Sequence, residues 1–236
     1  MVNIRDTHTT EISSKASLTI LLIDFNEMFL SGTIGILNSQ YADIKILTAQ
    51  TSHMGIEQIE LFKPDLVIMD IMLPKKLGGT AKINTGMQLL IYLMNNHPQT
   101  NIVVYSEYIQ SLVRIKSEIN SYQKGFVAAD KNLSSTEIMA RINWSLQGLT
   151  HIKDIQKISD NLELKPEWLR LLNLAFGEAL QDKAIAQDIC VSERMVRNYW
   201  HRLQQILGID SEELKSQGKN LRIVTLKRAR EAGLID

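Results

Sequence analysis

The sequence has a single cysteine, Cys190, among its 236 residues, and it has no long apolar run. One cysteine cannot build an internal disulfide framework or a zinc site made of several cysteines, so a reducing compartment is expected. No stretch reaches the ~18 apolar residues that a membrane-spanning helix needs. The polar start, residues 1–16, has no apolar signal core that would direct export. These absences predict a cytoplasmic protein with no membrane partner.

An excess of charge of either sign is also absent, because 26 Lys and Arg balance 26 Asp and Glu. DNA-binding proteins usually carry a basic excess, so the balance taken alone argues against nucleic acid. The length and the 44% hydrophobic content are those of a folded chain of one or two domains. The total charge therefore does not show how the charges are distributed between domains.

Short apolar runs alternate with helical patterns in the first half of the chain. A β-strand followed by a helix, repeated several times, predicts a parallel sheet covered by helices on both faces. The expected strands are Ser17–Asp24, Ile44–Thr48, Asp65–Asp70, Asn101–Ser106 and Gly125–Ala129. The expected helices are Met28–Leu37, Met54–Phe62, Thr85–Met94, Ile109–Ile119 and Ser134–Leu146.

Polar groups follow four of these strands, namely Asp24, Asp70, Ser106 and Lys131. One Asp after a strand is usually a simple turn former, but four such groups at one edge of a sheet suggest a binding site. Two carboxylates can hold a hard divalent cation, whereas a hydroxyl and an ammonium group can bind a phosphoryl group.

These residues, with the run Asp70-Ile-Met-Leu-Pro74, resemble the receiver domain of two-component response regulators over about residues 17–147. The resemblance implies an α/β doubly wound, flavodoxin-like fold with five parallel strands in the order 2-1-3-4-5. It further implies that Asp70 accepts a phosphoryl group from a sensor histidine kinase. Asp24 and Asp70 would help to bind Mg²⁺, and Ser106 and Lys131 would contact the phosphoryl group.

Three features depart from that family. Phe25 follows Asp24 where a second acid is usual, which predicts a weakened Mg²⁺ site; Glu27 is a candidate substitute. Residues 75–85 read as an inserted loop beside the acceptor, with no role that the sequence assigns. Phe126 is the nearest candidate for the aromatic switch position, and it fits the core equally well.

The second half of the chain loses the strands and keeps helical spacing. Residues 184–207 read as two short helices joined at Ser192, a good N-cap, with a cationic second helix, as in a helix-turn-helix. An amphipathic pair with a merely solvated charged face is the plain alternative. Between residues 192 and 230, however, nine Lys or Arg face only four Asp or Glu, a local basic excess that suits phosphate binding.

This half resembles the LuxR/NarL-type DNA-binding domain, through Leu164–Glu167, Lys183–Ala186, Val191–Asn198 and Leu207–Ile209. The resemblance implies an all-α helix-turn-helix domain that dimerises, so a homodimer is expected. Carried over by position, Arg197, Asn198 and His201 would face base edges, and Lys183, Arg194 and Arg202 would contact phosphates. Cys190 is expected to pack as a small apolar residue beneath the turn.

The predicted organisation is a polar extension (1–16), a receiver (17–147), a linker (148–163) and the helix-turn-helix domain (164–236). The leading hypothesis is a response regulator that binds DNA and controls transcription. It is switched by phosphorylation at Asp70 or, because the acid pair is incomplete, by atypical control. The rival is a phosphorylation-independent adaptor that binds proteins, with Trp168 and Trp200 as anchors. No catalytic set of residues is apparent, so an enzyme is not expected.

Overall fold

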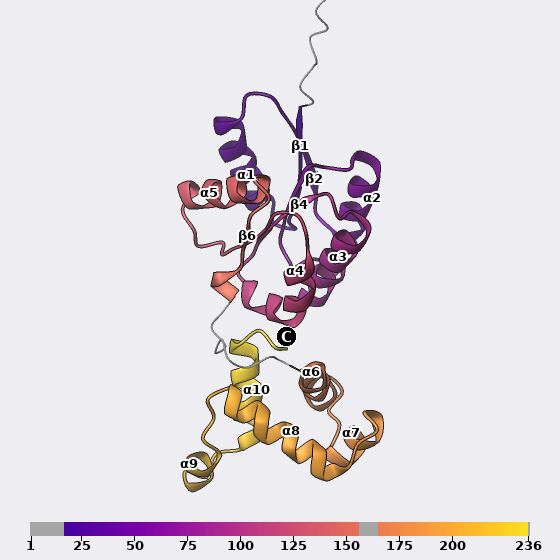
Figure 1. Cartoon of the computed structure of the whole chain (residues 1–236), viewed down its shortest axis with the longest axis vertical. Coiled ribbons are helices and arrows are strands. Elements are labelled where there is room, and N and C mark those ends of the chain that lie inside the picture. The colour runs from indigo at the N-terminus through magenta and orange to yellow at the C-terminus, as the bar shows by residue number, and fades with distance from the viewer. Residues whose placement is uncertain (1–16, 156–164, 236) are drawn as a thin grey trace, which may run out of the picture.

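The structure, a computed structural model, describes residues 17–155 and 165–235 (Figure 1). The predicted extension 1–16 lies outside the described residues, as do residues 156–164 of the predicted linker and residue 236. Residues 17–155 form an α/β part, and residues 165–235 form a helical part. The exact limits predicted for the receiver, the linker and the helix-turn-helix domain stay predictions.

The α/β part is built around one parallel sheet with the strand order β2-β1-β3-β4-β5-β6. The first five strands confirm the predicted order. In chain order the elements are β1 (Leu18–Ile23), α1 (Glu27–Gln40), β2 (Ile44–Ala49), α2 (Ser52–Phe62), β3 (Leu66–Met69), α3 (Ile83–Asn96), β4 (Asn101–Tyr105), the 3₁₀ helix η1 (Ile109–Ile115), α4 (Lys116–Ser121), β5 (Phe126–Ala129), α5 (Ser135–Leu146), β6 (Thr150–His151) and the 3₁₀ turn η2 (Lys153–Ile155).

The sixth strand corrects the predicted count of five. After α5 the chain turns back at Gly148, and Thr150 and His151 pair in parallel with Phe126 and Val127 of β5. The strand has only two residues, too few to show a periodic pattern. Ile155 follows in η2 and is 2% exposed, packed into the same core as the strands. The chain therefore continues to pack against the α/β part as far as residue 155.

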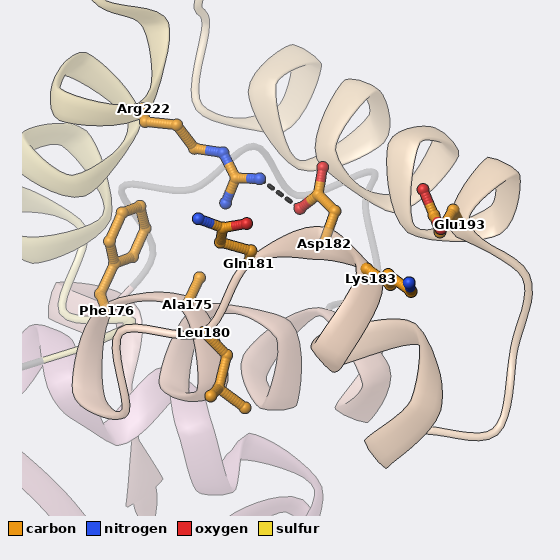
Figure 2. Close-up of a pocket in the computed structure, with 8 residues that line it drawn as sticks. All are labelled: Ala175, Phe176, Leu180, Gln181, Asp182, Lys183, Glu193 and Arg222. Carbon is orange, nitrogen blue, oxygen red and sulfur yellow. Dashed lines mark hydrogen bonds and ion pairs between the residues drawn. The ribbon is translucent and has the colours of Figure 1, made fainter.

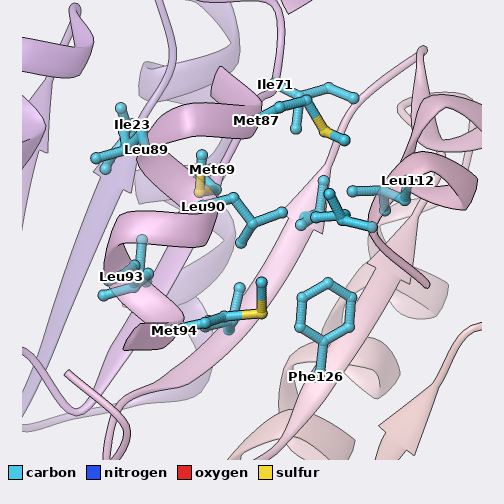
Figure 3. Close-up of a cluster of buried hydrophobic side chains, with 14 of the residues drawn as sticks. Ile23, Met69, Ile71, Met87, Leu89, Leu90, Leu93, Met94, Leu112 and Phe126 are labelled. Atoms are coloured by element: carbon cyan, nitrogen blue, oxygen red, sulfur yellow. The ribbon is translucent and has the colours of Figure 1, made fainter. Parts of the chain in front are cut away.

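The core of the α/β part has two layers, one on each face of the sheet. Side chains of α1 and α5 cover one face, and side chains of α2, α3, η1 and α4 cover the other. Figure 3 shows the second layer, in which Met94 of α3 points toward Phe126 of β5. Phe126 is fully buried, which confirms the core interpretation of this residue. Strands buried on both faces need the continuous apolar runs that the sequence contains.

The predicted helix Ile109–Ile119 is wrong in its first half, where η1 replaces an α-helix. Ile109, Leu112 and Ile115 are all buried, and they recur at every third position. A 3₁₀ helix has three residues per turn, so this spacing places all three side chains on one line facing the core. The backbone N–H of Ser111 donates to the carbonyl of Tyr108 at 2.9 Å, as this tighter turn requires.

The helical part packs around a third, separate core. Its elements are α6 (Pro166–Leu172), the π turn η3 (Asn173–Gly177), α7 (Asp182–Asp188), α8 (Glu193–Ile206), α9 (Ser211–Ser216) and α10 (Leu221–Glu231). Pro166 occupies the first turn of α6, where its missing N–H costs no hydrogen bond. Among residues 17–155 and 165–235, none of the helices is both long and apolar enough to span a membrane.

Candidate functional site

Four polar groups meet at the carboxyl edge of the sheet, as the sequence predicts. Asp24 follows β1, Asp70 follows β3, Ser106 follows β4, and Lys131 lies just beyond β5. The Nζ atom of Lys131 lies 2.6 Å from Oδ2 of Asp24 and 2.6 Å from Oδ2 of Asp70. The side chain of Lys131 is only 5% exposed, so the three charges form a buried cluster in which one ammonium bridges two carboxylates.

Ser106 completes the surroundings of Asp70. Its hydroxyl donates to Oδ1 of Asp70 at 2.6 Å, and the backbone N–H of Met72 donates to the same oxygen at 3.0 Å. The Ser106 hydroxyl also accepts from the backbone N–H of Tyr108 at 3.1 Å. Both oxygens of Asp70 are thus engaged, and Ser106 connects this acid directly to the start of the segment that carries η1.

Burial and hydrogen bonds shift the pKa values of Asp24 and Lys131. Desolvation raises the pKa of Asp24, although the hydrogen bonds from Lys131 and from the backbone N–H of Asn26 oppose it. Desolvation works against the charge on Lys131, but its hydrogen bonds to Asp24 and Asp70 outweigh that effect and raise its pKa. Lys131 therefore stays an ammonium group at neutral pH, and the cluster carries its own cation.

Phe29 is a member of the site that the sequence did not reveal. The Nζ of Lys131 lies 4.1 Å from the centroid of the Phe29 ring, a cation–π contact. Phe29 lies in α1, and its ring also meets Tyr105 edge to face. The helical position of Phe29 gives no hint of this role, because an apolar residue facing the sheet reads as ordinary core.

The helix-turn-helix predicted from the sequence is present in the helical part. α7 and α8 are joined by a short turn, and the Ser192 hydroxyl accepts from the backbone N–H of Met195 to cap α8. Val196, Trp200 and Leu203 form the buried face of α8. The cap and the apolar spacing therefore define the same helix that the sequence predicts.

The prediction for Cys190 is wrong. Cys190 is exposed at the turn between α7 and α8, with a positive φ of 55°. The flanking Ile189 and Val191 pack against the core of the helical part in its place.

The opposite face of α8 is open to solvent. The six residues predicted to contact DNA are all exposed: Lys183, Arg194, Arg197, Asn198, His201 and Arg202. Five of them lie on α8, and Lys183 lies on the first turn of α7. The fold thus gathers these cationic and amide side chains on the helix-turn-helix rather than dispersing them.

A polar cluster behind this face ties three helices together. Asp182 accepts a hydrogen bond from the indole N–H of Trp200 at 3.0 Å, and it forms an ion pair with Arg222 of α10 (Figure 2). The guanidinium of Arg222 lies 3.8 Å from the centroid of the Trp200 ring. The contacts link α7, α8 and α10, so the orientation of the exposed face depends on them.

The arrangement of the α/β part matches a known family. Residues 20–143 match the family described as the response regulator receiver domain. The chain belongs to this family. The receiver of this chain is its α/β part, and the cluster of Asp24, Asp70, Ser106 and Lys131 occupies the carboxyl edge of the receiver sheet.

Curated relatives and solved structures extend the likeness beyond the receiver. The transcriptional activator protein ExaE of Pseudomonas putida is 24% identical over 81% of this chain and 91% of its own length. The transcriptional regulatory protein YdfI of Bacillus subtilis is 24% identical over 74% of this chain and 81% of its own.

The structural neighbours include RcsB of Salmonella enterica serovar Typhimurium, bound to promoter rprA in the presence of the phosphomimetic BeF₃⁻. It has a TM-score of 0.54 and 16% identity, and the match covers 90% of this chain and 98% of RcsB. An RcsB–DNA complex has a TM-score of 0.58 and 16% identity, over 91% and 98% of the two chains. The TM-scores and the coverage show that the fold is shared with RcsB.

The receiver family implies Mg²⁺, but the donor set of this receiver fits that ion poorly. Among the described residues, Asp24 and Asp70 are the only carboxylates of the cluster, and the Lys131 ammonium already lies between them. Phe25 is 46% exposed, and its side chain supplies no oxygen. The predicted substitute, Glu27, accepts instead from the Gln50 amide at 3.1 Å. No group of three or more potential ligand side chains occurs in the described part of the chain.

Proposed function

We propose that this protein is a DNA-binding transcriptional regulator whose receiver sets the state of a helix-turn-helix. The observation that carries the proposal is the exposed face of α8, where Arg197 and Asn198 supply the groups that pair with guanine and adenine edges. Relatives that act in transcription, and neighbours described as bound to DNA, support the same reading. A chain with a balanced total charge can bind DNA because its basic groups are concentrated in the helical part.

The six exposed residues divide into two roles. Arg197, Asn198 and His201 lie along α8 and would read base edges in the major groove. Lys183, Arg194 and Arg202 would contact phosphates and fix the register of the domain on the duplex. We propose a homodimer for this binding, since one neighbour is described as two RcsB dimers on two parallel DNAs.

The test is a selection from a random duplex library, followed by fluorescence anisotropy on the selected sequence. Arg197→Ala and His201→Ala should each weaken binding at least tenfold, because a good base contact is worth about 1–3 kcal/mol and the proposed homodimer loses it twice. Lys76→Ala removes the same charge from an exposed loop of the receiver and should bind like the parent. Equal affinity of all four proteins would overturn the proposal.

The rival function, an adaptor that binds proteins through Trp168 and Trp200, finds little support in the geometry. The two residues are 6% and 5% exposed, and both belong to the core of the helical part. A buried ring cannot anchor a partner without unfolding its own domain. The adaptor predicts that DNA retention is absent at every salt concentration, and the anisotropy titration decides the matter.

We propose that Asp70 is the residue through which the receiver is switched. Its carboxylate contacts Ser106 and Lys131, so any group that changes Asp70 must rearrange both. Phosphoryl transfer from a sensor histidine kinase is the control that the family implies. The geometry favours a control that does not depend on Mg²⁺, because an ammonium group lies between the two carboxylates that would hold the ion.

Incubation with acetyl phosphate and Mg²⁺, followed by intact mass measurement, separates the two modes of control. A conventional receiver included as a positive control should gain a phosphoryl group. This protein should show no adduct above the level seen for Asp70→Asn. Stoichiometric labelling of the parent, absent from Asp70→Asn, would establish ordinary phosphorylation instead.

A further inference from the structure

The residues that follow α10 contact η1 of the receiver. Figure 1 shows the yellow C-terminal segment next to the receiver. The Nε of Arg114, in η1, donates to the carbonyl oxygen of Gly233 at 2.7 Å. Leu234 is 2% exposed within the core of the helical part, and Val113 of η1 packs against that core as well as against the receiver core. A single receiver segment thus contacts the helical part through a hydrogen bond and through apolar packing.

Gly233 fits this place only because it has no side chain. A Cβ added there would lie 2.5 Å from the backbone C of Gln110 and 2.5 Å from the backbone N of Ser111, so the two backbones meet face to face. Its φ of +71° is the left-handed conformation that ends many helices. The backbone N–H of Leu234 donates to the carbonyl of Ala229 at 2.8 Å, which completes this type of helix end.

Gly218, which follows α9, has the same type of helix end as Gly233 but no close neighbour. α9 ends in the same way at Gly218, with a φ of +67° and a 3.0 Å bond from the Lys219 N–H to the Leu214 carbonyl. A Cβ added at Gly218 meets nothing within 4 Å, in contrast to Gly233. The close approach at Gly233 therefore belongs to the contact with the receiver and is not a property of the turn.

The docking place is also connected to the acceptor acid by hydrogen bonds. Ser106 donates to Asp70 at 2.6 Å and accepts from the Tyr108 N–H at 3.1 Å. The Tyr108 carbonyl in turn accepts from the N–H of Ser111 at 2.9 Å. The peptide that ends this chain of bonds, Gln110–Ser111, is the one on which Gly233 lies.

We propose that Gly233 and Arg114 form an anchor that positions the helical part on the receiver, and that the coupling through Ser106, which the receiver family implies, reaches this anchor. In the anchored arrangement the six candidate DNA contacts remain exposed, so the anchor orients the recognition face and does not cover it. This inference rests on the proposed function, since orientation matters only if α8 binds DNA.

The test measures the arrangement of the two parts without DNA. Cys190 is the only cysteine and is exposed, so adding Gln123→Cys on the receiver gives one pair of spin labels. Pulsed electron–electron distance measurements are made on labelled protein diluted into unlabelled protein, so that only distances within one chain contribute. The parent should give one narrow distance peak.

Gly233→Ala and Arg114→Ala should each remove most of that narrow peak and spread it over longer and shorter distances. Gly218→Ala is the matched control, with the same φ strain and no clash, and it should keep the peak. A narrow peak in Gly233→Ala identical to that of the parent would overturn the anchor. A loss of the peak in Gly218→Ala as large as in Gly233→Ala would overturn it too.

A second pair of variants tests whether Ser106 links the acceptor site to the anchor. Ser106→Ala should lower the fraction in the narrow peak by at least half, since it frees the Tyr108 N–H at the start of the segment that carries η1. Ser145→Ala alters another fully buried serine of the receiver, away from η1, and should leave the fraction unchanged. An unchanged fraction in Ser106→Ala would overturn the coupling through Ser106. None of these results depends on DNA affinity, so they stand apart from the test of the proposed function.

Discussion

The ammonium of Lys131 lies 2.6 Å from the carboxylate of Asp24, a residue 107 positions earlier in the chain. Their side chains are 5% and 9% exposed, so the pair is almost fully removed from water. Removing two charges from water is costly unless their attraction and their hydrogen bonds compensate. The contacts of Lys131 with Asp70 and with the ring of Phe29 supply that compensation.

Lys131→Met should therefore destabilise the receiver strongly. The substitution leaves two carboxylates buried side by side without a counter-charge, and breaking such a pair costs about 3–5 kcal/mol. Urea unfolding followed by circular dichroism measures the loss. Lys76→Met, at an exposed position, should stay within about 0.5 kcal/mol of the parent. A loss as small for Lys131→Met would contradict the buried cluster.

Phe25→Asp should give the receiver a response to Mg²⁺ that the parent lacks. The new carboxylate follows Asp24 and adds a third oxygen donor, and hard divalent cations favour sites with several oxygen ligands. Thermal unfolding with and without millimolar Mg²⁺ measures the response. The parent should show no shift, whereas the variant should gain about 2.7 kcal/mol when Mg²⁺ reaches 100 times its Kd. A parent that gains as much as the variant contradicts the mismatch of its donor set.

The two proposed roles on the helix-turn-helix predict different responses to salt. Lys183→Ala or Arg202→Ala should make the negative slope of log K against log salt shallower by about 1.8, because each removes one phosphate contact, worth about 0.9, from each subunit of the proposed homodimer. Asn198→Ala should keep the slope and reduce the preference for the selected sequence over unrelated DNA. Anisotropy titrations at several salt concentrations give both quantities. Equal slopes for all variants would contradict the division into phosphate and base contacts.

Tyr122 should be among the last tyrosines to ionise. Burial raises its pKa to about 12, and its hydroxyl donates to the Thr100 carbonyl at 2.5 Å. Since the folded pKa lies above the usual value of 10.0, the neutral ring stabilises the fold below pH 10, and this contribution is lost as the pH rises through 12. The difference in unfolding free energy between the parent and Tyr122→Phe should shrink over this window. A difference that stays constant from pH 9 to 12 would contradict the assignment.

The receiver cluster could be predicted because its signals are local. Asp24 and Asp70 end apolar strands, and parallel strands bring such ends to one edge of the sheet. The face of α8 could be predicted for a similar reason, since Ser192 marks the start of the helix and the apolar spacing fixes which side is buried. In both places short-range chemistry and the global fold agree.

Other features depend on contacts that no local pattern encodes. The ring of Phe29 meets Lys131 across the gap between α1 and the end of the sheet, and its apolar character fits plain core equally well. The contact of Gly233 with η1 joins segments more than a hundred positions apart, between parts with separate cores. Cys190 is exposed in a turn where it adopts a positive φ, a conformation that its residue type alone does not predict.

The short strand β6 has a practical consequence for building chimeric regulators. Thr150 and His151 cover the outer edge of β5, and Ile155 fills a place in the receiver core. A receiver cut at Gln147 would expose β5 as an open edge, and open edges invite pairing with other chains and aggregation. Fused to a foreign output domain, this receiver keeps both its edge covered and its core complete only when the junction lies beyond Ile155.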